Sequence, residues 1–377
     1  MDPVTEPDVP TWTYTLCDMR SGEELAVLPL TQVKYTRQLN GVGSLDAYLH
    51  LADAKVRELQ PWAATQQRRT TLYAEYGVPG DQRCVWGGVV TARHRPSSSS
   101  GMSLTCVSWE GWLYRQRLLL DLELTDTMRG TVDQLVRAAQ FRTDLGLRVD
   151  TGDPGPDLYN VYLVRDVKPV LELVDDLGTS TETPLEYLVE STRDPDTGVF
   201  VPVMRLGIPR LGRRYEDTQL TYQYPDGALT AWELVEDGSA ASNILTVLGS
   251  GSGDTQPWFV MEDEEAGVDE LGFNYPTWAS DLRLQDTDDW DLMHARAAAA
   301  LRAGKASEYV FSGVTVRAEE YLGQVSPGDD VGLEITHPSL EEYPQAVTNV
   351  TRVLGESVTV GDGGQRDQVS LTVGGTP

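Results

Sequence analysis

Four histidines and a few short runs of serine, glycine and aspartate are the residues of this chain that could do chemistry. His94 has the richest surroundings, because Arg93 and Arg95 flank it and four serines follow at 97–100. A histidine can act as a general base near neutral pH and can activate a neighbouring serine. A single histidine between two arginines is more typical of an exposed loop, however. We therefore predict no catalytic role for His94.

The glycine-rich stretch GSGSG at 249–253 resembles two known motifs and satisfies neither of them. A serine-hydrolase elbow has the serine at the centre of Gly-x-Ser-x-Gly, where this chain has Gly251. A dinucleotide fingerprint needs a wider spacing of its third glycine, here Gly253, and a following helix in a βαβ unit. We predict a flexible turn at 249–253.

No metal or cofactor site is predicted from the spacing of possible ligands. The histidines lie far apart in the sequence, at His50, His94, His294 and His337. No His-x-x-x-His or Cys-x-x-Cys pattern occurs, so a zinc site is not indicated.

Two aspartate runs resemble fragments of calcium loops. The aspartates concerned are Asp194 and Asp196 in DPDTG, and Asp286, Asp288 and Asp291 in DTDDWD. Neither run has the full ligand set or the closing glutamate of a calcium loop. Turn and helix-cap roles explain these aspartates better, and calcium at either run stays an open alternative.

Adjacent carboxylates are expected by chance in a chain with 58 acidic residues. The doublets at 175–176 and 329–330 therefore do not indicate a glycosidase pair, although the sequence alone leaves such a pair open. The stretch SPGDDV at 326–331 predicts a tight turn, with Pro327 and Gly328 at its centre and Asp329 bonded to the local backbone. We predict no catalytic residue in this chain.

Length and composition indicate a globular protein of two or three domains. The chain has 377 residues, 40% hydrophobic and 23% charged, and no apolar run near the ~20 residues of a membrane helix. The acidic, proline-rich start, residues 1–10, lacks the features of a signal peptide. We expect no membrane insertion.

The three cysteines and the net charge narrow the class further. Cys17, Cys84 and Cys106 show no paired spacing, so we predict small buried residues in strands within a reducing compartment. A disulfide between Cys84 and Cys106 is the alternative. The net charge of −28 argues against a protein that grips phosphate backbones, and the aromatic residues have no basic stripe beside them.

Alternating apolar residues predict strands over the first part of the chain. In 33–51 the residues Leu45, Ala47, Leu49 and Leu51 alternate with polar ones, after a tight turn at Asn40 and Gly41. The stretch 84–113 predicts two paired strands, Val85–Arg93 and 102–107, joined through the serine run. Gly87 and Gly88 indicate a bulge or a close backbone approach. Residues 1–122 therefore predict a first β-barrel or sandwich.

The pattern then changes to helical spacing. We expect a helix over 130–141 with Thr131 as its N-cap, and a second over 168–178 with Pro169 in its first turn and Gly178 as its end. Strands at 185–190 and 199–206 follow. Residues 123–214 therefore predict an inserted α+β domain.

A second β region completes the chain. Its predicted strands lie at 219–224, 228–237 and 242–253, and again over 305–377. The interruption at 251–304 predicts a loop-rich insertion with one helix, capped by Asp288 or Asp289 and ended at Gly304. The fold class is therefore mainly β with α+β insertions, with two tube-like β-barrel domains at 1–122 and at 215–250 plus 305–377.

The order of these pieces resembles the hub-type minor tail proteins of long-tailed phages of actinobacteria, and the resemblance covers nearly the whole chain. In the second half, ASNILTVLGSGSGDTQ, an acidic insertion with a helix, YVFSGVTVR, a PGD-x-V turn and the strands of 347–353 follow the family's order. In the first half, VKYTRQLNGVGSLDAYLHL, VWGGVVT and VSWEGWLYRQRL are similar to its hairpin pattern.

The resemblance implies a structural virion protein at the tail tip, or baseplate hub. Two tube-like barrels per subunit in a homotrimer would form a pseudo-sixfold ring that continues the tail tube and lines the DNA channel. Its implied partners are the distal tail or tail-tube ring above, other tip proteins below and the tape-measure protein. No enzymatic activity, cofactor or specific nucleic-acid binding is implied. The competing interpretations are a carbohydrate-binding attachment module and a cell-wall hydrolase.

Overall fold

The protein divides into two compact bodies, which we describe separately. The computed structural model describes residues 10–98, 100–180, 183–237, 242–262, 276–285, 287–304, 308–340, 348–363 and 365–374. Our sequence assignments at the remaining positions, among them 1–9, 99, 241, 263–270, 286, 305–307 and 347, lie outside the described residues. The main body takes in 1–232 and 312–377, and the inserted body takes in 233–311.

The main body begins with a β unit, which we call the first β unit. Its elements are β1 (Thr11–Asp18), β2 (Glu24–Val27), β3 (Thr31–Gln38), β4 (Ser44–His50), α1 (Ala54–Glu58), α2 (Pro61–Ala64), β5 (Thr70–Val78), β6 (Asp81–His94), β7 (Gly101–Ser108) and α3 (Trp109–Arg115). The strands pair in the order β3-β4-β7-β6-β5-β1-β2. Only Leu28, Pro29 and Leu30 separate β2 from β3, so the two ends of this run lie close together and the sheet curls into a barrel-like unit.

The predicted alternation holds in this unit. Leu45, Ala47 and Leu49 on β4 are buried, and so are Met102 and Leu104 on the neighbouring β7. Burying each leucine or methionine contributes about 1.5–3 kcal/mol before entropy is counted. The unit is therefore held by an apolar interior, with polar side chains on the outside.

The two glycines of β6 lie where we predicted a close backbone approach. A Cβ on Gly88 would meet the Val107 carbonyl oxygen at 2.2 Å, and a Cβ on Gly87 would meet the Ser191 hydroxyl oxygen at 2.6 Å. The cysteines are free, so the alternative disulfide is wrong. Cys106 is opposite Val90, six residues along β6 from Cys84.

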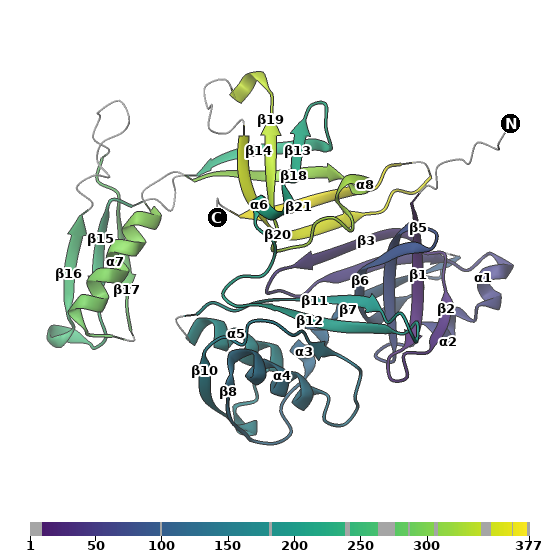
Figure 1. Cartoon of the computed structure of the whole chain (residues 1–377), viewed down its shortest axis with the longest axis horizontal. Coiled ribbons are helices and arrows are strands. Elements are labelled where there is room, and N and C mark those ends of the chain that lie inside the picture. Colours follow the sequence, from purple (N-terminus) through teal and green to yellow (C-terminus); the bar gives the residue numbers. More distant parts are fainter. Residues whose placement is uncertain are drawn as a thin grey trace. The chain divides into compact units, whose positions relative to one another are not determined.

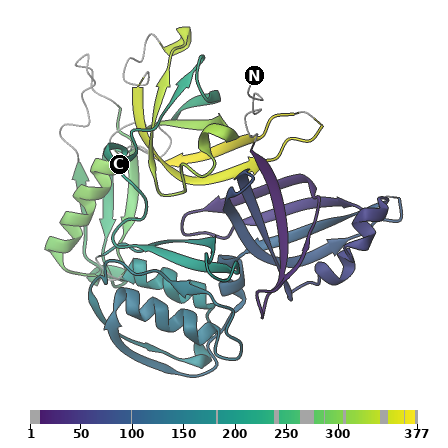
Figure 2. The same cartoon turned by 45° about the vertical axis from the view of Figure 1, so that its right-hand side comes forward.

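The α+β segment follows. Its elements are β8 (Leu122–Thr127), α4 (Met128–Ala139), β9 (Arg148–Val149), β10 (Asp157–Tyr162), a short 3-10 turn (Val164–Asp166), α5 (Val170–Ser180), β11 (Glu186–Arg193) and β12 (Phe200–Gly207). They share one apolar core with α3, which we had placed in the first β unit. Both views show β11 and β12 beside the first β unit, and β11 contacts β6 (Figure 1, Figure 2).

Two helix boundaries differ from our predictions. The N-cap of α4 is Thr127, whose hydroxyl accepts from the Gly130 N–H at 3.1 Å, and the predicted cap Thr131 is buried within the helix. Gly130 lies within the helix, next to the Asp126 carboxylate. A Cβ at this position would lie 2.2 Å from that carboxylate, so only glycine leaves room for it. Gly178 does not end α5, because the helix continues to Ser180. Gly178 packs closely against Leu185.

The second β unit completes the main body. Its elements are α6 (Tyr215–Thr218), β13 (Thr221–Tyr224), β14 (Leu229–Asp237), β18 (Glu308–Arg317), α8 (Ala318–Tyr321), β19 (Asp330–Ile335), a 3-10 turn (Pro338–Leu340), β20 (Thr348–Thr359) and β21 (Gln368–Gly374). The strand order is β14-β18-β21-β20-β19-β13. Residues 225–228 alone separate β13 from β14, so this run also curls back on itself.

One antiparallel pairing joins the two β units into a single 13-stranded sheet. The second half of β20, Gly355–Thr359, pairs with Gln38–Lys34 on β3. The first half of β20 pairs with β19 instead. A strand of one unit is therefore also a strand of the other, and the predicted mainly β fold is confirmed.

The inserted body is a three-stranded sheet with one helix on it. Its elements are β15 (Ile244–Leu248), a 3-10 turn (Gly253–Thr255), β16 (Trp258–Glu262), β17 (Ala279–Arg283) and α7 (Trp290–Gly304). The insertion is wider than the predicted 251–304. We had assigned β15 to the second barrel, but it pairs with β16 and β17, and its Leu245 and Val247 pack against α7.

Candidate functional site

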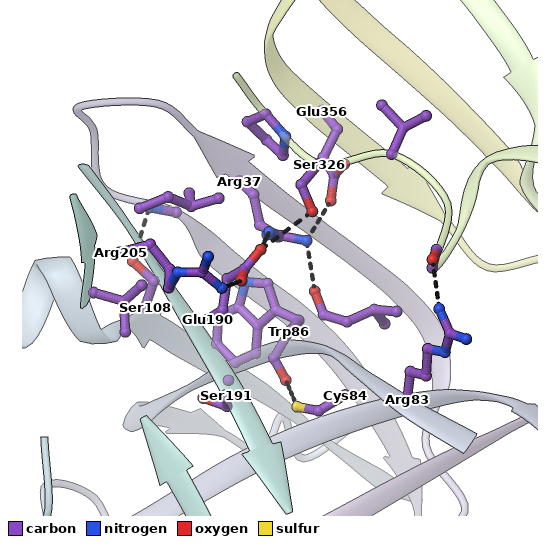
Figure 3. A pocket seen from close by; sticks show the side chains of 18 of the residues that line it. Arg37, Arg83, Cys84, Trp86, Ser108, Glu190, Ser191, Arg205, Ser326 and Glu356 are labelled. Atoms are coloured by element: carbon purple, nitrogen blue, oxygen red, sulfur yellow. Dashed lines mark hydrogen bonds and ion pairs between the residues drawn. The ribbon is translucent and has the colours of Figure 1, made fainter. Parts of the chain in front are cut away.

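A polar cavity of about 740 Å³ lies where the three parts of the main body meet, and we call it the junction cavity (Figure 3). Its walls come from β3 and β6 of the first β unit, from β11 of the α+β segment, and from β20 and residues 322–329 of the second β unit. Arginine and carboxylate side chains dominate these walls: Arg37, Arg83, Arg193, Arg205 and Arg213, with Glu75, Glu110, Glu190, Asp329 and Glu356.

Arg37 is the centre of this cavity. Alternation along β3 places it on the same side as the buried Tyr35, so it points inward. In the β3–β20 register Arg37 is directly opposite Glu356, and its Nη1 lies 3.4 Å from the Glu356 Oε1. The same Nη1 donates to the Val85 carbonyl oxygen at 3.3 Å, and Nη2 lies 3.5 Å from the Glu190 Oε1. One guanidinium therefore links all three parts of the main body.

Glu356 is a buried carboxylate with two partners. Its side chain is 1% exposed, and the Tyr321 hydroxyl donates to Oε2 at 2.6 Å. Burial raises the pKa of Glu356, while Arg37 opposes that rise. Burial alone would lower the pKa of Arg37, but Glu356 and Glu190 outweigh it and raise that pKa overall. Each charge is therefore stabilised by the other.

Glu190 extends the network of charges toward Arg205 of the α+β segment and toward Ser326 of the second β unit. Its Oε2 lies 3.4 Å from Nη1 of Arg205, and the Ser326 hydroxyl donates to Oε1 at 3.2 Å (Figure 3). Arg205 in turn lies 3.1 Å from the Asp150 carboxylate, which also pairs with Arg129. The network thus runs from the cavity into the α+β core.

A second arginine ties the α+β segment to the first β unit. Arg193 contacts Glu75 through two nitrogens, at 2.8 Å and 3.0 Å, in the bidentate geometry that arginine forms with carboxylates. Its guanidinium carbon lies 4.1 Å from the centre of the Phe200 ring. Phe200 stacks on Tyr73 with 4.0 Å between ring centres.

Three further arginine–carboxylate pairs join the segment 186–213 to the second β unit. Arg352 holds Glu186 through two nitrogens, at 2.8 Å and 2.5 Å. The other two pairs are Arg210 with Asp330, and Arg213 with Asp329 at 2.7 Å. The three parts of the main body are therefore connected by paired charges, and the first β unit and the α+β segment also by the stacking of Phe200 on Tyr73.

Glu110 lines the cavity without an arginine partner in the described residues. Its Oε1 accepts from the Val189 N–H of β11 at 2.6 Å, and burial raises the pKa of its carboxyl. Two residues earlier on the same edge of β11, the Tyr187 N–H donates to the Asn40 Oδ1 at 2.7 Å. These two side chains occupy backbone donors on the free side of β11.

The carboxylates of the junction cavity are engaged by donors of the protein itself. The carboxylates accept hydrogen bonds from arginines, hydroxyls or backbone N–H groups, so each is held in one place. The adjacent doublets also separate: Asp329 pairs with Arg213 and Asp330 with Arg210, while Asp175 accepts from Tyr187 at 2.7 Å and Asp176 from Lys168 at 2.7 Å. Neither doublet directs both carboxylates at one point.

The residues that the sequence singled out lie apart from this cavity. The four histidines are in four places: His50 stacks edge-on with Tyr48, His94 is exposed at the end of β6, His294 stacks on Phe259, and His337 lies beside Trp232. Within the described ranges no group of three histidine, cysteine, aspartate or glutamate side chains is placed to hold a metal ion. Residues 249–253 lie in the connection between β15 and β16, so the predicted strand over 242–253 ends at Leu248.

In the two possible calcium loops, the carboxylates of Asp194 and of Asp289 bond the local backbone. The Asp194 Oδ1 accepts from the N–H groups of Asp196 and Thr197, at 3.1 Å and 2.9 Å, and the Thr197 N–H lowers the pKa of Asp194. Asp289 is the cap of α7, because its Oδ1 accepts from the Asp291 and Leu292 N–H groups at 2.9 Å and 3.0 Å. Asp286 lies outside the described residues.

The turn at 326–331 was predicted correctly, but its long-range role was not. The Asp329 N–H donates to the Ser326 carbonyl at 3.1 Å, and the Ser326 N–H donates back to the Asp329 carboxylate at 3.1 Å. The pairing of this carboxylate with Arg213, and that of Arg37 with Glu356, join residues more than 100 positions apart. No local pattern could have found either pair.

No helix in the part of the chain that the structure describes is both long enough and apolar enough to cross a membrane.

Comparison with known proteins gives similarity of structure only. No protein-family model and no curated protein sequence matches the chain. The tail protein from Neisseria meningitidis MC58 superposes with a TM-score of 0.56 at 13% identity, over 96% of both chains. The 43 kDa tail protein of prophage MuSo2 from Shewanella oneidensis gives 0.58 at 12% identity, over 96% of this chain and 98% of that chain. Prophage tail protein gp18 from Listeria monocytogenes EGD-e gives 0.50 at 11% identity, over 95% of this chain and 94% of that chain.

At these identities the similarity shows a shared fold. The expected resemblance to phage tail proteins is confirmed at that level, and the narrower assignment to actinobacteriophage hubs stays a prediction. This chain has the fold of these phage and prophage tail proteins.

Proposed function

We propose that the chain is a structural protein of the phage tail tip, where it forms the hub of the baseplate. Three copies would form a ring that continues the tail tube. The observation that carries this proposal is the pairing of β20 with β3, which joins two barrel-like units into one sheet within one chain. Three such chains would present six barrel-like units around one axis.

The charged network supports this role. A ring that transmits force along a tail needs the two β units held at a fixed angle within each subunit. Arg37 joins the two β units through Glu356, Arg193 joins the α+β segment to the first β unit, and Arg352 joins it to the second. A site for turnover would need polar groups left available to a substrate, whereas the carboxylates of the junction cavity are held by protein donors.

The net charge supports passage of DNA without retention. A ring of three chains that each carry −28 would repel duplex DNA, and at physiological salt the repulsion would act over a Debye length of about 8 Å. The proposed partners are a tail-tube or distal tail ring above, other tip proteins below and the tape-measure protein. The proposed location is the virion tail tip, after assembly in the host cytoplasm.

Mass photometry of the purified chain over a concentration series tests the proposal. We expect a species at three times the 41.5 kDa chain mass that grows with concentration. Obligate subunit contacts bury roughly 2,000 Å² or more, so the species should persist at moderate salt. A 41.5 kDa monomer at every concentration, also in the presence of the tail-tube protein, would contradict the proposal.

A further inference from the structure

The inserted body presents an unpaired edge strand with exposed aromatic side chains on both of its faces. The sheet order is β16-β15-β17, so β16 forms one edge (Figure 1). In the described part of the chain, β15 is the strand to which β16 is paired. We propose that β16 is a docking edge that takes an extended, basic segment of another tail protein by strand addition. The proposal goes beyond the ring and does not require it.

The register shows which backbone groups are available. The Gly249 N–H donates to the Pro257 carbonyl at 2.9 Å, and in an antiparallel pair the residues that bond their neighbour recur at every second position. Phe259 and Met261 therefore bond toward β15. The N–H and C=O groups of Trp258, Val260 and Glu262 point away from it, toward the open edge.

Aromatic side chains lie on each side of this edge. Trp258 and Val260 are 62% and 50% exposed, on the face of the sheet opposite α7. On the helix side, Trp290 is 50% exposed and lies 5.5 Å from Phe259 between ring centres. His294 stacks flat on the same Phe259 ring at 4.0 Å.

This arrangement suits an added strand. Successive side chains of a strand point to opposite faces, so an added strand would place alternate residues beside Trp258 and beside Trp290. In strand addition the main-chain hydrogen bonds supply affinity, and contacts to alternate side chains supply specificity. Most proteins protect such an edge, because unpaired backbone groups beside apolar side chains invite pairing. The exposure of Trp258, Val260 and Trp290 beside this open edge therefore indicates that a partner covers it.

Charge selects the chemistry of the partner. The sequence of the inserted body, 233–311, holds sixteen acidic and four basic residues, a net charge of −12. A basic segment would be attracted to it, whereas a second copy of the same edge would bring two strongly negative bodies together. A flat sugar platform would place its aromatic rings on one face, whereas Trp258 and Trp290 lie on opposite faces of β16.

Fluorescence anisotropy with the full chain and three labelled peptides tests the proposal. The probe is Lys-Lys-Thr-Val-Thr-Val-Thr-Lys-Lys. Its controls are the same peptide with glutamate for lysine, and the same peptide N-methylated at every second residue. We expect saturable binding of the basic peptide, and loss of about tenfold or more in affinity for the N-methylated one, because roughly one or more backbone hydrogen bonds are lost. Hydrogen exchange should show protection of the Trp258, Val260 and Glu262 amides in the complex.

A proline variant locates the site on the chain. Val260→Pro removes an N–H that faces outward, a position where edge strands accept proline. We expect it to weaken the basic peptide about tenfold, while Val260→Ala, which keeps the N–H, retains most of the affinity. The N-methylated peptide gives the same information without altering the protein. Absence of binding, equal binding of all three peptides, binding of chitin or laminarin oligosaccharides at Trp258, or self-association lost in Val260→Pro would each overturn the proposal.

Discussion

Arg37 on β3 and Glu356 on β20 lie directly opposite each other in the pairing that joins the two β units, with Nη1 and Oε1 3.4 Å apart. The pair is buried, with side-chain exposures of 13% and 1%. The point of contact between the two curled sheets is therefore also the centre of the charged network. Arg37 and Glu356 therefore contribute both to the continuous sheet and to the charged contacts that hold the junction.

Removal of one partner of this pair should be costly. Arg37→Ala leaves Glu356 buried without its cation, and we expect the free energy of unfolding to fall by about 3–5 kcal/mol in urea titrations. The control is Arg137→Ala, which breaks an exposed helical pair with Asp133 and should cost about 0–1 kcal/mol. The double variant Arg37→Met/Glu356→Leu should lose less than Arg37→Ala, because no charge is left unpaired. Equal costs for Arg37→Ala and Arg137→Ala would show that the junction pair does not stabilise the fold.

Glu110 should make stability fall with rising pH. Burial raises the pKa of this carboxyl in the folded chain, so the folded state holds the proton more tightly than the unfolded state. The resulting contribution is fully present below the unfolded value of about 4.3 and is lost as pH rises through the folded value. Glu110→Gln removes this dependence and can still accept from the Val189 N–H. Urea titrations from pH 4 upward should show the variant gaining on the wild type as pH rises, and the reverse trend would refute the assignment.

Asn40 should stabilise the fold in two ways, through its left-handed backbone conformation and through its hydrogen bond to β11. Its φ is 52°, in the left-handed region, and its Oδ1 accepts from the Tyr187 N–H at 2.7 Å. Asn40→Gly keeps the conformation and loses the hydrogen bond, at a cost of about 1 kcal/mol. Asn40→Ala should cost about 1 kcal/mol more, since alanine resists this conformation. If the two variants unfold at the same urea concentration, the left-handed turn is not a source of stability here.

The acidic chain should not retain DNA. With a net charge of −28, we expect no shift of duplex DNA in gels at micromolar protein and physiological salt. Lowering the salt should not create binding, because less screening strengthens the repulsion between the acidic chain and the DNA phosphates. A salt-sensitive complex with duplex DNA would mean that a basic surface exists, contrary to the proposed non-adhesive channel.

Strands and helices that show a regular spacing of apolar residues could be predicted from the sequence. Alternation over Leu45–Leu49 identified β4, and helical spacing identified α4 and α5 within a few residues. The predicted cap of α4, Thr131, was wrong: Thr127 caps the helix, and Gly130 lies within it, where it leaves room for Asp126. The inserted body was drawn too small because β15 carries the same apolar alternation as the strands of the β units and was assigned to them. Its partner β17, ASDLR, is short and exposed and carries no apolar alternation.

The junction could not be predicted for a different reason. Arg37 and Glu356 are 319 positions apart, and each lies in a strand whose polar residues look like an ordinary exposed face. Only the register of β3 against β20 brings them together. The histidines lie apart from the junction, and Asp194 and Asp289 lie in a turn and at a helix cap, where local hydrogen bonds hold them.

Cryo-electron microscopy of the purified chain, alone and with its tail-tube partner, tests the proposed hub most directly. We predict threefold particles with an open bore, in which each subunit contributes both β units to the ring wall through the β3–β20 pairing. Compact single-copy particles without a bore under both conditions would contradict it.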